Sequence, residues 1–262
     1  KYRGKFAHGW DAERERRFAK QKELGLFPRD AQLSPRAPEA KAWKDLPAAE
    51  RADWDLRMAV YAGMIDCMDQ GVGRVLDAVR KIGAEQNTLV LFLSDNGASA
   101  EFLDTWPNTA RGHKPGSEAG SRESHKCLEV GWANAANTPF REHKMWDHEG
   151  GISTPLIVSW PAGIAALGQF TREPGHVIDL QPTFLELAGT KYPTHLKDRA
   201  LTPLPGRSLL PTLQGKPLGL LARNVQLRLR IKYLELDLAA IDAFLGISLL
   251  RRELDRANRF AA

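Results

Sequence analysis

A continuous apolar run over residues 88–93 constrains the fold of this chain more than any other feature. A run of this length without alternating polar residues is typical of a parallel β-strand that helices cover on both faces. It follows residues 45–79, where apolar side chains recur at steps of three and four and predict a long helix. We therefore expect an α/β fold with a mostly parallel sheet flanked by helices.

The apolar stripe of this long helix is expected to lie in the core. It consists of Trp54, Met58, Tyr61, Ile65, Met68, Val72, Val75 and Val79. By contrast, the charged residues 11–24 are typical of an exposed helix with a solvated face, which Gly25 ends. Residues 97–142 show little periodicity and predict a long loop region, of a kind that is usually functional or disordered.

Further elements are predicted later in the chain. Residues 155–160 form a second apolar run of strand length, and residues 176–189 predict a helix that Pro182 kinks or extends and Gly189 ends. Residues 225–233 alternate strictly between apolar and polar, as a half-buried strand does. Residues 239–260 return to a helical pattern.

The net charge of +5 does not predict a nucleic-acid partner. Residues 216–262 hold 9 Lys/Arg and 5 Asp/Glu, so 28 and 27 remain for residues 1–215. A uniformly basic face is therefore not expected, and the basic tail lacks interleaved aromatic residues that would stack on bases. We expect no binding of nucleic acid.

The apolar runs also argue against a membrane span. The longest, residues 89–93, is far shorter than the roughly 20 residues that cross a bilayer. The start of the chain has no apolar signal-peptide segment and no methionine, and we interpret the chain as a fragment. Cys67 and Cys127 form neither a disulfide framework nor a zinc motif.

The apolar run 88–93 ends at Asp95-Asn96-Gly97, which offers a carboxylate and an amide oxygen side by side. Ligands of α/β proteins gather at the carboxyl ends of parallel strands, and a glycine frees the backbone to bring both oxygens to one point. Hard oxygen donors suit calcium, although calcium takes six to eight ligands. The alternative is that these residues are only a turn.

A second polar stretch lies at residues 137–163. Lys144 precedes His148-Glu149-Gly150-Gly151, directly before the second predicted strand. A lysine ammonium is a compact charge suited to an oxyanion, and two glycines allow a close approach of backbone. Taken alone, Lys144 is more readily interpreted as a surface lysine.

Taken in order, these stretches resemble the sulfatases, in the arylsulfatase branch of the alkaline-phosphatase superfamily. The matching segments are KYRGKFAHGWD, YAGMIDCMDQGVGRVLDAV, NTLVLFLSDNG, GWANAANTPFREHKMWDHEGGISTPLIVSWPAGI, HVIDLQPTFLELAG and PLPGRSLLPTLQGK. The resemblance covers residues 1–217 and implies a partial alkaline-phosphatase-like sandwich, truncated at the N-terminus. Residues 218–262 would be an atypical basic tail outside it.

The resemblance also implies roles for single residues. Asp95 and Asn96 would be two ligands of one calcium ion, completed by residues that this chain lacks, and Lys144 would contact the sulfate group. His148, His143 and Arg141 would lie near the substrate pocket. Phosphate-ester hydrolases of the superfamily tend to carry His where this chain has Asn96, so the residue favours sulfate over phosphate.

The chain also departs from the family. Sulfatases form their formylglycine nucleophile in a C-x-P-x-R or S-x-P-x-R segment, and neither Cys67, Cys127 nor any serine fits that pattern. We therefore expect sulfuric ester hydrolysis by the complete protein and no activity of this chain alone. The alternatives are a non-catalytic remnant that binds an anionic ligand or a partner, and a phosphoester hydrolase of the superfamily.

The expected partner is a sulfated small molecule or carbohydrate. We also expect self-association through core that the truncation leaves exposed. The family is often exported, but the sequence does not determine where this chain is located.

Overall fold

The computed structural model describes residues 1–102, 113–164, 168–217 and 228–233, the last range by its backbone alone. The chain divides into two compact units. Among the described residues, unit 1 holds those of Lys1–Ala78 and Gly97–Gly151, and unit 2 holds those of Val79–Asn96 and Ile152–Leu236. The predicted helix at 239–260 lies outside the described residues.

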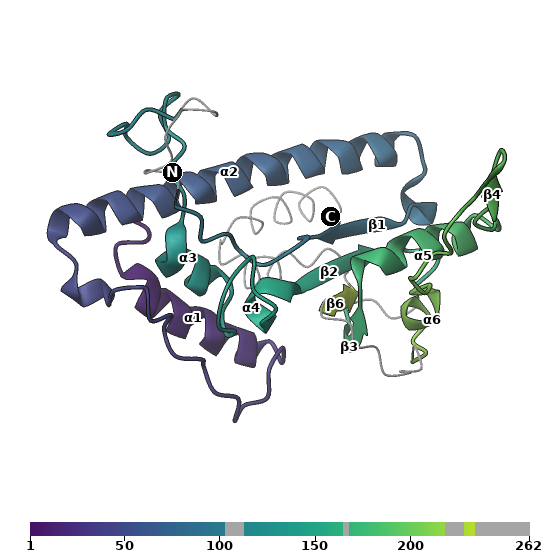
Figure 1. Ribbon diagram of the computed structural model, residues 1–262, viewed down its shortest axis with the longest axis horizontal. Helices are drawn as coiled ribbons and strands as arrows, with labels where there is room; N and C mark the ends of the chain where they lie inside the picture. The colour runs from purple at the N-terminus through teal and green to yellow at the C-terminus, as the bar shows by residue number, and fades with distance from the viewer. Residues whose placement is uncertain (103–112, 165–167, 218–227, 234–262) are drawn as a thin grey trace, which may run out of the picture. The chain divides into compact units, whose positions relative to one another are not determined.

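Unit 1 is helical. Its elements are α1 (Gly9–Glu23), a 3₁₀ helix (Trp43–Asp45), most of α2 (Ala48–Lys81), α3 (Glu129–Ala136) and the first residues of α4 (Glu149–Ile152). Helices α1 and α3 pack side by side, as Figure 1 shows. No helix of the described part of the chain is long and apolar enough to span a membrane.

An aromatic cluster forms the core of unit 1. The ring of Trp132 on α3 is fully buried and meets the rings of Trp10, Trp43 and Phe6 edge-on at centroid distances of 5.7–5.9 Å. The Trp132 indole N–H donates to the backbone oxygen of Trp54, so its one polar group is satisfied (3.0 Å). Gly131 lets α3 approach this cluster, because a Cβ there would lie 2.7 Å from the Trp10 ring.

Two sequence predictions fail on the helices of unit 1. The α1 face that was expected to be solvated buries Glu13, Arg14 and Arg17. Its guanidinium groups donate to backbone oxygens of the loop that follows α1, at Ser34, and of the last residue of α3, Ala136. Conversely, the apolar stripe of α2 is not core along its length. The fully buried residues of α2 lie between Arg57 and Ala62, whereas Met68 and Val75 are 42% and 64% exposed.

Helix α3 lies inside the stretch that was predicted to be a loop. The helix is buried nearly all round, from Gly131 to Ala135, and it therefore lacks the alternation of apolar and polar residues that reveals a surface helix. The loop prediction, which rested on this lack of periodicity and on the many Gly, Ser, Asn and Pro residues, is wrong for residues 129–136.

Unit 2 contains a four-stranded sheet in the order β1-β2-β6-β3. The strands are β1 (Val90–Leu93), β2 (Ser153–Ser159), β3 (Phe170–Gly175) and β6 (Arg228–Tyr233). Two 3₁₀ helices (Glu85–Asn87 and Val177–Asp179), α5 (Leu180–Leu187), α6 (Leu210–Leu213) and a small hairpin of β4 (His195–Leu196) and β5 (Arg199–Ala200) complete it. The predicted second strand, the helix before Gly189 and the strand near 225–233 are confirmed.

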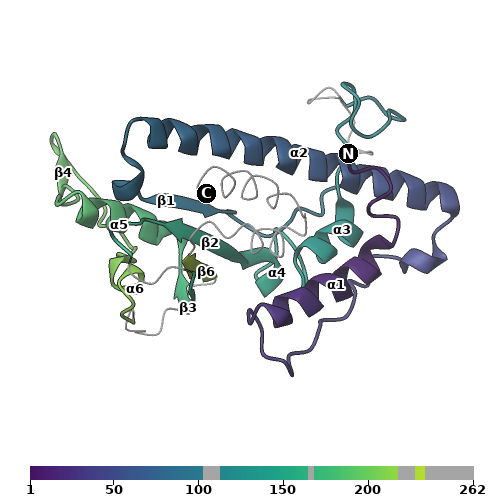
Figure 2. The same cartoon turned by 180° about the vertical axis from the view of Figure 1, so that it is seen from behind.

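The expected mostly parallel sheet is not what the described strands form. β1 pairs antiparallel with β2 and β3 antiparallel with β6, while β2 and β6 are parallel. The reason lies in where the chain re-enters unit 2. Leu93, at the end of β1, pairs with Leu156 in the middle of β2, and β2 then runs back along β1 until Ser159 pairs with Val90. The two strands are therefore antiparallel (Figure 2).

The core of unit 2 lies on one face of β2. Leu156 and Val158 are buried there against Leu209 and Leu213 from the region of α6. The buried Asp179 fixes the connection to α5, because its carboxylate accepts the backbone N–H groups of His176 (2.9 Å) and Arg207 (2.7 Å). The mixed α/β architecture that the sequence predicts is therefore present.

Candidate functional site

The turn that follows β1 belongs to unit 2 and is held at both ends. The Thr154 hydroxyl, from β2, donates to the backbone oxygen of Ser94 (2.7 Å). The Ser94 hydroxyl donates to the backbone oxygen of Asn96 (2.7 Å). Asp95 lies between them with an exposed carboxylate, and no hydrogen bond or ion pair joins it to any residue that the structure describes.

The turn offers ligand atoms of the type that a hard cation prefers, but too few of them to complete its coordination. A carboxylate and an amide oxygen are suitable calcium ligands, and calcium needs six to eight. Within residues 1–102, 113–164 and 168–217, no group of three or more His, Cys, Asp or Glu residues is arranged to hold a metal. Asp95 and Asn96 can thus be part of a calcium shell whose remaining ligands come from elsewhere.

Gly97 directly follows this turn and is the first residue of the segment that belongs to unit 1. The sequence suggested that this glycine frees the backbone for a turn, but its φ does not lie in the left-handed region. The reason for glycine is a close approach of backbone. The Gly97 N–H donates to the oxygen of Gly151 (2.9 Å), and a Cβ on Gly97 would lie 1.7 Å from the oxygen of Gly150.

The Gly150-Gly151 pair is packed just as closely. A Cβ on Gly150 would lie 2.2 Å from the oxygens of Arg141 and Glu142, and one on Gly151 would lie 2.1 Å from the oxygen of Trp146. From the sequence, we expected these glycines to allow a close approach of backbone. The backbone that approaches them is that of residues 141–146, which we call the Lys144 loop.

The Lys144 loop has a fixed backbone and a half-exposed ammonium group. The Lys144 backbone N–H donates to the oxygen of Ala98 (3.0 Å), and the backbone N–H of Gly150 donates to the oxygen of Arg141 (3.0 Å). The Lys144 ammonium lies 3.5 Å from a carboxylate oxygen of Glu101, in a pair that is 39% and 38% exposed. The loop therefore presents a cation from a rigid support.

The other predicted pocket residues lie on or next to this loop, within unit 1. The Arg141 guanidinium lies 3.1 Å from the His148 Nδ1. The His143 ring nitrogen lies 2.9 Å from the backbone oxygen of Lys144, and the ring packs edge-on against Trp146. The structure thus gathers the four predicted substrate residues in unit 1, whereas Asp95 and Asn96 belong to unit 2.

The sequence analysis missed two residues that contact this region. Glu101 pairs with the Lys144 ammonium, and Asn137 bonds to the backbone of Ala98 and of Glu142. Glu101 stands in no periodic or motif-like pattern. Asn137 lies inside the family-like segment that also contains Lys144, but no pattern in the sequence indicated a role of its own.

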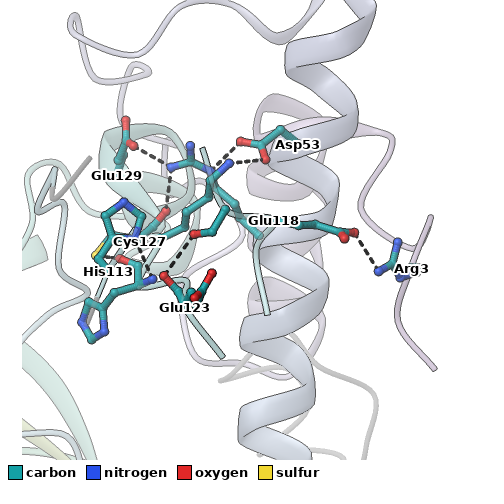
Figure 3. A network of polar contacts seen from close by, with 11 residues as sticks. Arg3, Asp53, His113, Glu118, Glu123, Cys127 and Glu129 are labelled. Atoms are coloured by element: carbon teal, nitrogen blue, oxygen red, sulfur yellow. Dashed lines mark hydrogen bonds and ion pairs between the residues drawn. The ribbon is translucent and has the colours of Figure 1, made fainter. Parts of the chain in front are cut away.

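A network of charges fixes the segment that leads into α3 (Figure 3). The buried Arg57 guanidinium donates to Asp53 (2.8 Å) and to Glu129 (2.6 Å), and the Lys126 ammonium donates to Asp53 (2.7 Å). Partial burial alone would raise the pKa of Asp53, but the hydrogen bonds from Lys126 and Arg57 hold that pKa below its ordinary value. This network anchors residues 126–129 on α2.

Comparisons with known proteins identify relatives of the chain. A family model described as Sulfatase matches residues 1–190. An uncharacterised sulfatase of Schizosaccharomyces pombe is 35% identical over 204 residues, which are 74% of this chain and 36% of that protein. An arylsulfatase of Klebsiella aerogenes is 30% identical over 220 residues, 80% of this chain and 46% of that protein.

Other matches cover less of the chain. A steryl-sulfatase of Mus musculus is 34% identical over 155 residues, 59% of this chain and 20% of that protein. The chain spans less than half the length of each of these relatives.

Proposed function

The chain belongs to the sulfatase family, and on that premise we propose that it forms part of an arylsulfatase-like enzyme that hydrolyses a sulfuric ester. The observation that carries the proposal is the Lys144 loop, whose backbone is bonded to Ala98 and Gly150 while its ammonium is paired with the half-exposed carboxylate of Glu101. A cation held in this way is exposed enough to attract a sulfate oxygen in competition with Glu101.

Each predicted residue has a role in this proposal. Lys144 binds the sulfate group and stabilises the negative charge that grows on its oxygens during hydrolysis. Arg141, His143 and His148 lie on or next to the same loop and favour an anionic substrate. Asp95 and Asn96 would hold one calcium ion, which when bound supplies a hard Lewis acid for an anionic oxygen.

The chain alone is proposed to bind and not to turn over its substrate. No C-x-P-x-R or S-x-P-x-R segment, from which the family makes its nucleophile, occurs in residues 1–262. Without a nucleophile, the charged groups stabilise bound sulfate but form no bond to sulfur. A non-catalytic role in which the chain only binds a sulfated sugar is the second candidate, and the same missing segment favours it.

Titration of inorganic sulfate and of an aryl sulfate into the purified chain tests the proposal. We expect saturable sulfate binding that Lys144→Ala weakens strongly, and no release of the aryl alcohol. Lys114→Ala is a matched control, because the Lys114 ammonium also has an exposed carboxylate partner in unit 1, Glu123 at 3.4 Å. Turnover of the aryl sulfate at a rate unaffected by calcium chelation would refute the proposal.

The calcium assignment needs a separate titration. We expect calcium to bind weakly to the chain, since it supplies two of six or more ligands, and Asp95→Asn to remove the heat of binding. A metal analysis that finds zinc or manganese bound instead of calcium would favour the phosphoester hydrolase.

A further inference from the structure

The side chain of Asn137 bonds to two segments that are far apart in the sequence. Its amide oxygen accepts the backbone N–H of Ala98 (2.8 Å), and its amide nitrogen donates to the backbone oxygen of Glu142 (3.1 Å). Ala98 in turn accepts the backbone N–H of Lys144 (3.0 Å). One carboxamide therefore closes a ring of hydrogen bonds around the backbone of the Lys144 loop.

The support of Asn137 is rigid. The residue ends α3, where its own N–H donates to the oxygen of Ala133 (3.0 Å). The next residue, Thr138, is buried and is fixed by its hydroxyl to Ala135 (2.7 Å) and by its oxygen to the amide of Gln21 on α1 (2.9 Å). The position of the carboxamide is thus set by the core of unit 1.

The chemistry of the ring suits an amide. The Ala98 N–H needs an acceptor and the Glu142 oxygen needs a donor, and a carboxamide presents both on two separate atoms of one short side chain. An aspartate of the same shape keeps the acceptor but loses the donor and places a charge against a carbonyl oxygen. The Lys144 loop has positive φ at Glu142 and Met145, which is strained for residues other than glycine. The two hydrogen bonds of the Asn137 side chain hold this strained backbone in place.

We propose that Asn137 is a positioning residue that locks the Lys144 loop in the conformation in which Lys144 binds sulfate. The part that concerns sulfate rests on the proposed function. The locking itself does not, because both hydrogen bonds lie within unit 1.

Amide hydrogen exchange and sulfate titration of the chain test the two parts separately. In Asn137→Ala, we expect the exchange of the Ala98 amide to accelerate about 2- to 12-fold, as the loss of one hydrogen bond predicts. Sulfate affinity should fall by a factor in the same range. Asn137→Asp should leave the exchange of Ala98 nearly unchanged but weaken sulfate binding, because only its bond to Glu142 is lost.

A double-mutant comparison distinguishes positioning of Lys144 from general destabilisation. On a Lys144→Ala background, Asn137→Asp should have no further effect on residual sulfate binding. Asn87→Ala is the matched control, since Asn87 also bonds through its side chain, to the Trp160 indole (3.2 Å), but in unit 2. It should change neither measurement.

Each outcome decides one part. Sulfate binding that is equal in the wild type and Asn137→Asp overturns the positioning role. Unchanged Ala98 exchange in a folded Asn137→Ala chain overturns the lock. If that variant does not fold, unchanged exchange of the Lys144 amide in Asn137→Asp overturns it instead, because that variant loses the bond to Glu142 in the Lys144 loop. If the wild type binds no sulfate, the proposed function fails, and the exchange of Ala98 still decides the lock.

Discussion

Replacing Glu101 by glutamine should tighten sulfate binding. In the structure the Glu101 carboxylate is the partner of the Lys144 ammonium, at 3.5 Å. An incoming sulfate must therefore compete with this carboxylate for the same cation and is also repelled by it. Glutamine has the same shape, so Glu101→Gln removes the competing charge and leaves the space filled.

The size of the effect follows from the exposure of the pair. Two unit charges 3.5 Å apart in water attract with about 1.2 kcal/mol, and the pair is more than a third exposed on both sides. Measured exposed ion pairs are worth about 0.2–1 kcal/mol, because ordering two side chains offsets part of the attraction. The dissociation constant for sulfate should therefore fall about 1.4- to 5-fold in the variant.

Isothermal titration of sulfate at low ionic strength measures this difference. Added sodium chloride should reduce it, since the Debye length shortens to about 3 Å at 1 M salt. Glu123→Gln is the control, because it removes the carboxylate from the comparable exposed pair with Lys114. The reasoning is refuted if Glu101→Gln binds sulfate no more tightly than Glu123→Gln at low salt.

Three further predictions concern stability. Trp132→Ala should lower the free energy of unfolding by about 3–5 kcal/mol, because the side chain is fully buried among aromatic rings. Trp146→Ala, at a 49% exposed position, should change it by less than about 0.5 kcal/mol. Denaturant titrations measure both values. Gly97→Ala should lower the free energy of unfolding by about 1–3 kcal/mol through overpacking. Gly63→Ala should not destabilise the chain, because a Cβ at this helical position meets nothing within 4 Å. Equal melting temperatures of the two variants would contradict this. Asp53 has a lowered pKa in the folded chain. Its ionised carboxylate therefore adds to the free energy of unfolding above its unfolded pKa of about 3.9, and this contribution disappears as the pH falls through the folded pKa. The difference in unfolding free energy between the wild type and Asp53→Asn should therefore shrink below pH 4, and a constant difference from pH 2.5 to 6 would rule out this linkage.

The sequence predicts the elements whose pattern is local. The strand at 90–93, the helix before Gly189 and the strand at 153–159 each have a run or a stop signal within a few residues. Strand direction is not local. It depends on where the chain re-enters unit 2, and the pairing of Leu93 with Leu156 is not visible in either segment alone.

Local patterns also identified some residues of the site, whereas residues that act through contacts with distant segments were missed. Lys144 and the glycine pair stand in a family motif, so the sequence identified them. Glu101 and Asn137 act through contacts made between segments 39–43 residues apart, and both partners of the Asn137 side chain are backbone groups, which carry no residue-specific signal. The buried charges of α1 were misjudged for a related reason, because their acceptors are backbone oxygens of segments that are distant in the sequence.

The three glycines around the Lys144 loop have a consequence for how this region can be varied. A side chain at Gly97, Gly150 or Gly151 would meet backbone atoms at 2.2 Å or less, so substitution at these positions is costly whatever the ligand. Variation of the loop, in nature or in a directed library, is confined to outward side chains such as Met145 and Trp146, which are 86% and 49% exposed. New specificities built on this backbone will therefore differ at the rim of the loop and share its interior.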